Sequence, residues 1–263
     1  MINIAVFIWQ FSLSDDPNSS ESPPVPGLSA ADEAVFEFGA ISYRLTHPGT
    51  ECGVVTAPQG ANLRGVEPVV CEGSADRRDA EDVAGVEVVD LEAPPWWVTV
   101  LTSMFMHGGW LHIIGNMLFL WVFGNNVEDA MGRVKFILFY LLAGAVAVYS
   151  QSVIDTTSTV PTIGASGAVA GVLGGYILLH PKARVVTLVL IVFFVTLIEI
   201  PAMILLGIWA VLQFLPALGQ VGVGDGGGDG VAYLAHVGGF IFGLLMIKLF
   251  TARRDERPKL GYG

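Results

Sequence analysis

One serine of the chain, Ser166, lies between glycines and is a candidate nucleophile. Ser166 lies in residues 164–171, GASGAVAG, which open a long apolar stretch. Polar groups at membrane depth are costly and commonly mark functional sites. A serine hydroxyl is a weak nucleophile until a base takes its proton, so a reactive Ser166 needs a partner from another segment. Alone, Ser166 is better explained as a small residue that lets two membrane helices pack.

Glycines at a four-residue spacing follow both Ser166 and a candidate base, His236. They are Gly167, Gly171 and Gly175 in the first segment and Gly239 and Gly243 in the second. This spacing allows two membrane helices to approach closely, which would bring the imidazole to the hydroxyl. Alone, His236 could equally be a structural histidine whose hydrogen bonds are satisfied.

His112 and Asn116 form a second polar group. They are four residues apart in one apolar segment, so both lie on the same face of a helix. With the backbone N–H of Ser166, they could donate hydrogen bonds to the oxyanion of acyl transfer, and each such donor is typically worth about 3 kcal/mol in the transition state. Alone, Asn116 is better explained as a contact with a neighbouring helix. Together, the four residues favour a Ser166–His236 dyad with oxyanion support, which needs no metal and no organic cofactor.

Apolar segments of membrane-spanning length must position these residues. The chain has 263 residues, of which 53% are hydrophobic and 14% are charged. About 20 apolar residues in a helix cross the roughly 30 Å hydrocarbon core of a bilayer. Segments of this kind occur at about 1–13, 109–125, 134–153, 163–180, 201–218 and 231–250. The first is too short to cross, so we expect a start upstream of Met1 or a truncated helix. The sequence predicts an all-α polytopic membrane protein with a six-helix bundle.

Basic residues set the expected orientation of this bundle. They follow the second, fourth and sixth segments, as Arg133 and Lys135, Lys182 and Arg184, and Arg253, Arg254, Arg257 and Lys259. Positive residues collect on the cytoplasmic side, and the three clusters share one side only if the apolar run 184–200 does not cross. We interpret that run as a buried or interfacial connection. Both termini are then cytoplasmic, and Ser166, His236 and His112 lie about 5–8 Å below the outer face at 1.5 Å per residue.

In this topology residues 14–95 form a long external loop after the first helix. They hold 16 acidic and 4 basic residues, a net charge of −12, whereas the rest of the chain has 8 acidic and 9 basic residues. This charge distribution excludes nucleic acid as a partner, since phosphates need a basic surface. Within the loop we expect a flexible linker at 14–33, a short amphipathic surface helix at 34–45, and little independent structure at 46–95.

Both cysteines of the chain, Cys52 and Cys71, lie in this loop. In an oxidising compartment a disulfide between them could stabilise the loop by roughly 3 kcal/mol. Two free thiols explain the sequence equally well. A zinc site is not expected, because the spacing lacks further His or Cys partners.

The chain resembles the rhomboid family of intramembrane serine proteases over roughly residues 96–250. The resemblance rests on HGGWLHIIGNMLFLWVFGNNVED at 107–129, on GASGAVAG, and on AHVGGFIFG at 235–243. It implies a six-helix core, a catalytic dyad of Ser166 and His236, and oxyanion support from His112 and Asn116. It also implies cleavage of transmembrane substrates near the outer membrane surface.

Two positions depart from patterns found in the family. Many relatives carry a Trp-Arg pair before the second helix, where this chain has Trp96-Trp97-Val98-Thr99. Some relatives place an aromatic residue four positions after the serine, where it stacks on the histidine, and this chain has Ala170 there. Another residue must therefore orient His236.

Other classes of protein match only fragments of the sequence. Residues 222–225 spell the GxGD of intramembrane aspartyl proteases, but the second aspartate that such enzymes need at membrane depth is absent. A dinucleotide site needs a strand before its glycines, and a zinc protease needs HExxH, which does not occur. A transporter would show inverted repeats and charged residues at the membrane midplane, and neither is seen.

We therefore expect an intramembrane serine endopeptidase of the cell membrane. The alternative is a catalytically silent rhomboid-like protein that binds membrane clients. The expected organisation is a first helix at 1–13, an external loop at 14–95, a rhomboid-like core at 96–250 and a cytoplasmic tail at 251–263. The expected partners are transmembrane proteins and the lipid bilayer, whereas the sequence specifies neither the substrate nor the number of subunits.

Overall fold

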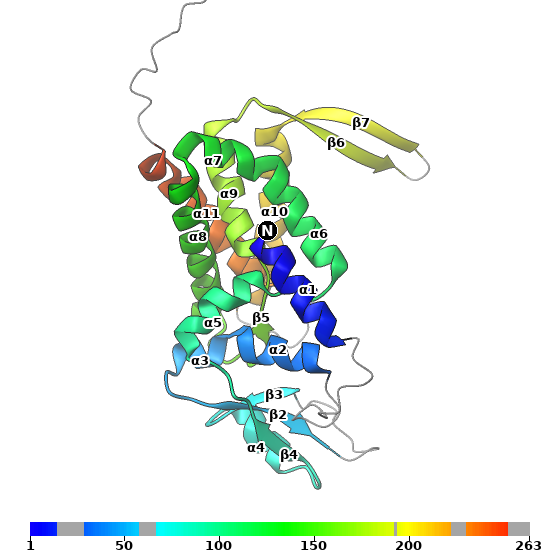
Figure 1. Ribbon diagram of the computed structural model, residues 1–263, viewed down its shortest axis with the longest axis vertical. Helices are drawn as coiled ribbons and strands as arrows, with labels where there is room; N and C mark the ends of the chain where they lie inside the picture. The colour runs from blue at the N-terminus through cyan, green and yellow to red at the C-terminus, as the bar shows by residue number, and fades with distance from the viewer. Residues whose placement is uncertain (15–28, 58–66, 192–193, 222–229, 252–263) are drawn as a thin grey trace, which may run out of the picture.

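The computed structural model describes residues 1–14, 29–57, 67–191, 194–221 and 230–251. Most of these residues are helical, and they form an elongated helical body with small sheets at its two ends (Figure 1). Most of the predicted linker at 14–33 and of the predicted tail at 251–263 lies outside the described residues.

The helical body contains apolar helices of different lengths. Their bounds are α1 (Ile2–Ser14), α5 (Trp96–Thr102), η1 (Ser103–Phe105), α6 (Trp110–Phe119), the π-helical turn η2 (Leu120–Gly124), α7 (Asn125–Met131), α8 (Arg133–Ile154), α9 (Ser166–Leu179), α10 (Ala202–Gln220) and α11 (Tyr233–Phe250). By length and composition, three of these described helices could each cross a membrane, namely α8, α10 and α11, whereas α1 and α9 are shorter. The predicted segment 109–125 is divided among α6, η2 and α7, and the six-helix count stays a prediction.

Helix α9 lies at the centre of the body. Residues 167–176 are all buried, and the helix packs against α8 and α11. The α9–α11 contact is close because glycines face each other across it. A methyl group on Gly243 would overlap the carbonyl oxygen of Gly171, and one on Gly239 would overlap that of Gly167. The glycine spacing seen in the sequence therefore produces direct backbone contact between these two helices.

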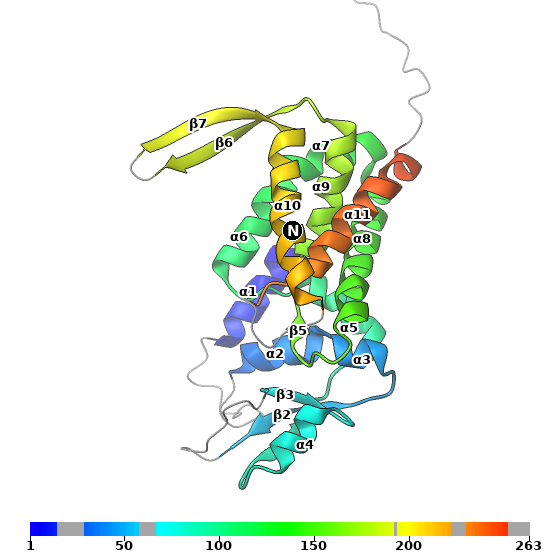
Figure 2. The ribbon, with the colours of Figure 1, turned by 180° about the vertical axis from the view of Figure 1, so that it is seen from behind.

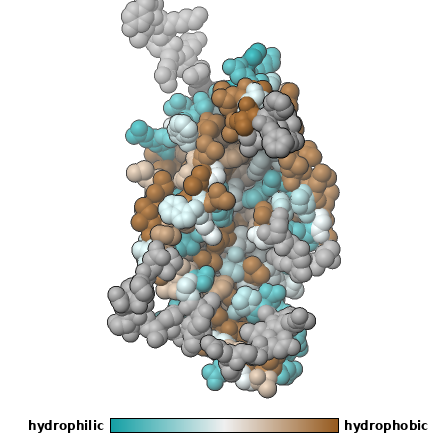
Figure 3. All heavy atoms as spheres, turned by 90° about the vertical axis from the view of Figure 1, so that its right-hand side faces the viewer, coloured by the Kyte–Doolittle hydropathy of each residue, from teal (hydrophilic) through white to brown (hydrophobic). Residues whose placement is uncertain are grey.

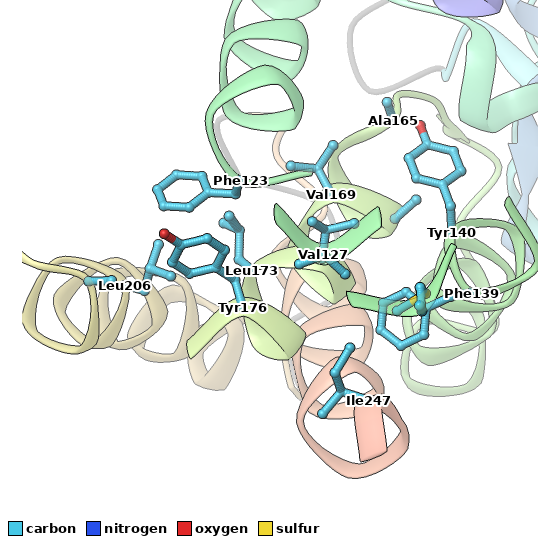
Figure 4. Close-up of a cluster of buried hydrophobic side chains, with 14 residues drawn as sticks. Phe123, Val127, Phe139, Tyr140, Ala165, Val169, Leu173, Tyr176, Leu206 and Ile247 are labelled. Atoms are coloured by element: carbon cyan, nitrogen blue, oxygen red, sulfur yellow. The ribbon is translucent and has the colours of Figure 1, made fainter. Parts of the chain in front are cut away.

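Larger side chains fill the rest of the interface around α9. Figure 4 shows Leu173 and Tyr176 of α9 among side chains of neighbouring elements, including Phe139 of α8, Ile247 of α11 and Leu206 of α10. Apolar side chains also cover much of the surface of the helical body seen in Figure 3. An apolar exterior around a packed interior is the arrangement expected of helices in lipid, where no water is available to solvate polar groups.

A small antiparallel sheet lies at one end of the helical body, and we call residues 51–57 and 67–91 the sheet subdomain (Figures 1 and 2). Its strands are β2 (Cys52–Thr56), β3 (Val69–Cys71) and β4 (Glu87–Asp90), in the order β3-β2-β4, and α4 (Ala75–Glu81) follows β3. Val54 and Val69 pair across β2 and β3 and are buried in a core with Ile41 and Tyr43. The expectation of little structure at 46–95 is wrong for these residues, and the chain as a whole is not all-α.

The described residues just before the sheet subdomain are also folded. It forms α2 (Ala30–Phe38), β1 (Ala40–Ile41) and α3 (Ser42–Thr46), where the sequence predicts one surface helix at 34–45. β1 pairs antiparallel with β5 (Pro161–Thr162), which comes just before Ser166. Ile41 of β1 is also buried in the core of the sheet subdomain, so this pairing connects that core to the segment that leads into α9.

Cys52 and Cys71 are directly opposite each other on β2 and β3 and form a disulfide. The bridge closes a loop with a sequence separation of 19 residues. We expect the double substitution Cys52→Ser and Cys71→Ser to destabilise the sheet subdomain by about 3 kcal/mol, because loop closure restricts the unfolded chain. Limited proteolysis should detect faster cleavage within residues 51–91, and wild-type protein treated with reductant should match the double variant. Equal protease resistance of oxidised wild type and the double variant would contradict this prediction.

The apolar run 184–200 forms a β-hairpin, not a helix. β6 (Arg184–Ile191) pairs antiparallel with β7 (Phe194–Pro201), and the hairpin extends sideways from the end of the body opposite the sheet subdomain (Figures 1 and 2). Several of its described side chains, among them Val186 and Leu197, are more than 60% exposed. The expectation of a buried connection is therefore wrong for these residues, whereas an interfacial location stays a prediction.

Candidate active site

Ser166 and His236 meet although they are 70 residues apart. Ser166 is the first residue of α9, and His236 lies one turn into α11. The close packing of these two helices brings Oγ of Ser166 to 2.8 Å from Nε2 of His236. A hydrogen bond of this length allows the imidazole to take the hydroxyl proton.

A second hydrogen bond fixes the other nitrogen of the His236 ring. Nδ1 lies 2.8 Å from Oε1 of Gln213 on α10. An amide oxygen only accepts hydrogen bonds, so the proton of the neutral imidazole is on Nδ1. Nε2 is then an acceptor and receives the hydrogen bond that the Ser166 hydroxyl donates. This is the tautomer that a general base requires.

His112 on α6 faces the segment that leads into Ser166. A methyl group on Gly164 would lie 2.6 Å from Nε2 of His112 and 3.6 Å from Oγ of Ser166, so both atoms border the same small space. The backbone N–H of Gly108 donates to Nδ1 of His112 at 3.4 Å. The proton of the neutral His112 ring is then on Nε2, which is directed toward that space as a donor.

Asn116 is one turn further along α6 and is buried. Its Nδ2 donates at 3.0 Å to the backbone carbonyl of His112. This bond takes one of the two amide protons and leaves the other to serve as a donor. The amide therefore also supports the helix turn that presents His112.

All four predicted residues line one cavity of about 790 Å³. Its wall is formed by α6, α8, α9, α10 and α11, which bring together residues from distant parts of the sequence. Ser166 is the first residue of α9, so its backbone N–H has no acceptor within the helix and is a further candidate donor to an oxyanion. The arrangement can activate a hydroxyl and stabilise an oxyanion beside it.

The loop before α6 is held by the first helix. The side chain of Gln10 on α1 accepts from the backbone N–H of His107 at 3.1 Å and donates to its carbonyl at 2.9 Å. Nδ1 of His107 lies 3.1 Å from the carbonyl of Phe105. These hydrogen bonds position the start of α6.

Two residues of the cavity were missed by sequence reasoning, Gln213 and Gln151. Gln213 contacts His236 directly, and Gln151 on α8 lines the cavity with a buried Oε1 that has no hydrogen-bond partner among the described residues. Both are polar side chains within predicted membrane segments, which is a signal of function in its own right. Trp209 lies beside His236, with ring centroids 6.2 Å apart, so an aromatic side chain from α10 lies beside the imidazole in a chain that has Ala170 on α9.

We expect Asn116→Ala to lower kcat by about 10- to 100-fold. This is less than the loss of about 100- to 1,000-fold that removal of a dedicated oxyanion donor causes, because one amide proton of Asn116 already bonds the carbonyl of His112. Asn125→Ala is the matched control. Nδ2 of Asn125 makes the same kind of bond, to the carbonyl of Trp121 at 3.1 Å, on an exposed face. Rates of cleavage of a tagged transmembrane substrate by the two variants would show whether Asn116 stabilises the oxyanion. An equal effect of both substitutions would show that Asn116 only supports its helix.

Comparison with known proteins identifies the family. The Rhomboid domain model matches residues 94–253, which is more than half of the chain. The mitochondrial presenilin-associated rhomboid-like protein of Bos taurus is 26% identical over 185 residues, covering 62% of this chain and 45% of the relative. The mitochondrial Rhomboid protein 1 of Saccharomyces cerevisiae is 30% identical over 152 residues, covering 56% and 40%.

A bacterial relative matches over a shorter stretch. The Rhomboid protease GluP of Bacillus subtilis is 40% identical over 79 residues, which are 30% of this chain and 15% of that protein. The chain thus spans less than half the length of these curated relatives. Because the family model covers the helices that carry Ser166, His236, His112 and Asn116, the chain belongs to the rhomboid family of membrane proteins.

Proposed function

We propose that this protein is an intramembrane serine endopeptidase that cleaves transmembrane segments of other proteins with a Ser166–His236 dyad. The observation that carries the proposal is the 2.8 Å hydrogen bond between Oγ of Ser166 and Nε2 of His236, which lies in the cavity of the helical body. Family membership supports the same chemistry, because rhomboids include proteases such as GluP.

The reaction follows from the protonation states of the two residues. Nε2 of His236 takes the proton of the Ser166 hydroxyl as Oγ attacks the scissile carbonyl carbon. The oxyanion that forms accepts hydrogen bonds from the Ser166 N–H and from His112 and Asn116. His236 then gives its proton to the leaving amine, which completes the acyl-enzyme. Water, with His236 again as the base, hydrolyses the ester and restores the hydroxyl.

The position of the dyad indicates where substrates are cut. Ser166 begins α9 and His236 lies one turn into α11, at the ends of these helices nearer the sheet subdomain, whereas α9 ends and α8 begins toward the other end of the body (Figure 1). Lys182 comes just after α9, and Arg133 is the first residue of α8. With positive residues on the cytoplasmic side, the dyad lies near the outer membrane face, in a cell membrane, with both termini cytoplasmic. The disulfide supports an external sheet subdomain, because disulfides persist in oxidising compartments.

Reconstitution in liposomes tests the proposal. Purified protein would be mixed with a model transmembrane substrate carrying a different tag at each end, and the products would be sized and mapped by mass spectrometry. We expect one cut near the outer end of the substrate's apolar segment. Binding of the substrate without any cleavage would contradict the proposal and assign the chain to the catalytically silent members of the family.

A further inference from the structure

Gln213 is the only described side chain that hydrogen-bonds Nδ1 of His236. It comes from α10, whose sequence AMILLGIWAVLQFLPALGQ is otherwise almost entirely apolar. The side chain is half-buried at the cavity wall, and it reaches the imidazole on the side opposite Ser166. A glutamine in an apolar helix is costly, so its contact with the candidate base requires an explanation.

We propose that Gln213 is a positioning residue that holds His236 in the reactive tautomer and ring orientation. This inference rests on the proposed function of the dyad. Without an acceptor at Nδ1, the ring proton would distribute between both nitrogens, and the fraction with a free Nε2 lone pair would fall. The ring would also rotate more freely, because its other hydrogen bond among the described residues is to the Ser166 hydroxyl. Gln213 thus fills, as a neutral acceptor, the place that a carboxylate fills in a Ser–His–Asp triad.

The second glutamine of α10 supplies a matched control. Nε2 of Gln220 donates to the backbone carbonyl of Val231 at 2.9 Å, so it connects the end of α10 to the residues just before α11 and makes no hydrogen bond to His236. If Gln213 were only an anchor between these helices, Gln220→Leu would have the same consequences as Gln213→Leu.

The test combines kinetics with nitrogen-15 NMR of histidine-labelled protein. We expect Gln213→Leu to lower kcat by about 10- to 100-fold with KM within twofold, since only the base is affected. Gln213→Glu retains an acceptor and should restore most of the activity. The ring nitrogens of His236, assigned by loss of their signals in His236→Ala, should show a mixture of tautomers in Gln213→Leu and a single Nδ1–H tautomer in wild type and Gln220→Leu.

Each result separates the inference from the proposed function. Wild-type kcat in Gln213→Leu, unchanged His236 signals in that variant, or failure of a folded Gln213→Glu to recover activity would each overturn the positioning role. If the wild type cleaves no substrate while the tautomer still changes in Gln213→Leu, the proposed function fails and the positioning of His236 stands.

The β6–β7 hairpin exposes apolar side chains on both of its faces. Leu188 and Leu197 pair directly across the two strands, and with Val186 and Val195 they are between 57% and 68% exposed. The other face also carries an exposed apolar residue, Ile198. A two-stranded hairpin with apolar side chains on both faces is at best marginally stable in water, so this one requires an apolar surface that covers it.

We propose that the hairpin lies in the interfacial layer of the lipid leaflet at its end of the bundle. Its exposed residues continue into those of α10, where Met203 and Ile204 are each more than half exposed on the apolar surface of the body. The free edges of both strands exclude the hydrocarbon core, where unpaired backbone groups are not tolerated. Lys182, exposed just before β6, would face lipid headgroups.

Fluorescence of single labels tests this location. Because the disulfide occupies both native cysteines, Leu197→Cys can carry one environment-sensitive dye in protein reconstituted into phosphatidylcholine–phosphatidylglycerol vesicles. We expect blue-shifted emission that is quenched by lipids with a nitroxide near the headgroup and resists iodide. Asp79→Cys, on exposed α4, should give the opposite result. Iodide quenching at 197 equal to that at 79, or a blue shift that disappears on dilution of protein in the vesicles, would overturn the proposal, the latter in favour of contact with a second copy.

Discussion

Replacing Ser166 with alanine is expected to reduce cleavage of a transmembrane substrate by at least about 10⁴-fold, because the nucleophile is removed while the rest of the site remains. The substitution removes one oxygen atom from a half-buried position at the start of α9 and leaves the glycine contacts with α11 unchanged. The folded state should therefore be unaffected. Initial rates with a fluorogenic transmembrane substrate would measure the cleavage activity, and thermal unfolding in detergent would measure the stability.

Ser150→Ala is the matched control for this prediction. Ser150 lies on α8, and its hydroxyl donates to the carbonyl of Val146 in its own helix at 2.8 Å. Removing that hydroxyl changes a membrane-helix serine without touching the dyad, so we expect wild-type rates. Appreciable cleavage by purified Ser166→Ala, above that of a preparation lacking the protein, would exclude Ser166 as the nucleophile.

Adding a single methyl group at Gly243 is expected to destabilise the helical body strongly. A Cβ there would overlap the backbone of α9 at Gly171 and Gly175, which cannot rotate away as a side chain could. Overpacking of this kind typically costs about 1–3 kcal/mol, and more where backbone must move. We expect Gly243→Ala to lower the unfolding temperature clearly in detergent.

The same substitution should also abolish most of the activity. Gly243 lies seven residues, or about two helical turns, after His236 on α11. Displacing α11 from α9 would lengthen the bond between Ser166 and His236, and a misplacement of about 1 Å can reduce the rate by about 100-fold. Gly207→Ala on α10 is the control, because a methyl group there meets nothing within 4 Å. Equal stability and activity of the two variants would show that the glycine contact does not position the dyad.

The proximity of the candidate site residues was predictable where residue type and spacing carried the information. Ser166 and His236 each precede glycines at a four-residue interval, and that interval indicated that these two helices could approach closely. The structure brings both residues, with His112 and Asn116, to the wall of one cavity. Gln213 could not be placed in the same way, because α10 has no glycine or other polar residue three or four positions from it that would indicate which helix it faces.

The β-structure was missed for two different reasons. In the sheet subdomain, each strand contributes only a few valines, and the stable unit arises from pairing between strands distant in sequence and from the disulfide. At 184–200 the signal for strands is present, but the interpretation of the run rests on its hydropathy and on the basic residues around it, and neither distinguishes secondary structure. Valine, threonine and isoleucine dominate that run, and β-branched residues favour strands over helices. Hydrophobicity alone indicates burial or lipid contact and does not distinguish a helix from a hairpin.

Covalent labelling is the direct test of whether Ser166 is reactive with His236 as its base. A fluorophosphonate would be reacted with wild-type protein in liposomes, and the modified residue would be identified by mass spectrometry after proteolysis. We expect one adduct, on Oγ of Ser166, which forms at least about 100-fold more slowly in His236→Ala because the base is missing. Labelling of another residue, or labelling of Ser166 at an equal rate in His236→Ala, would contradict this expectation.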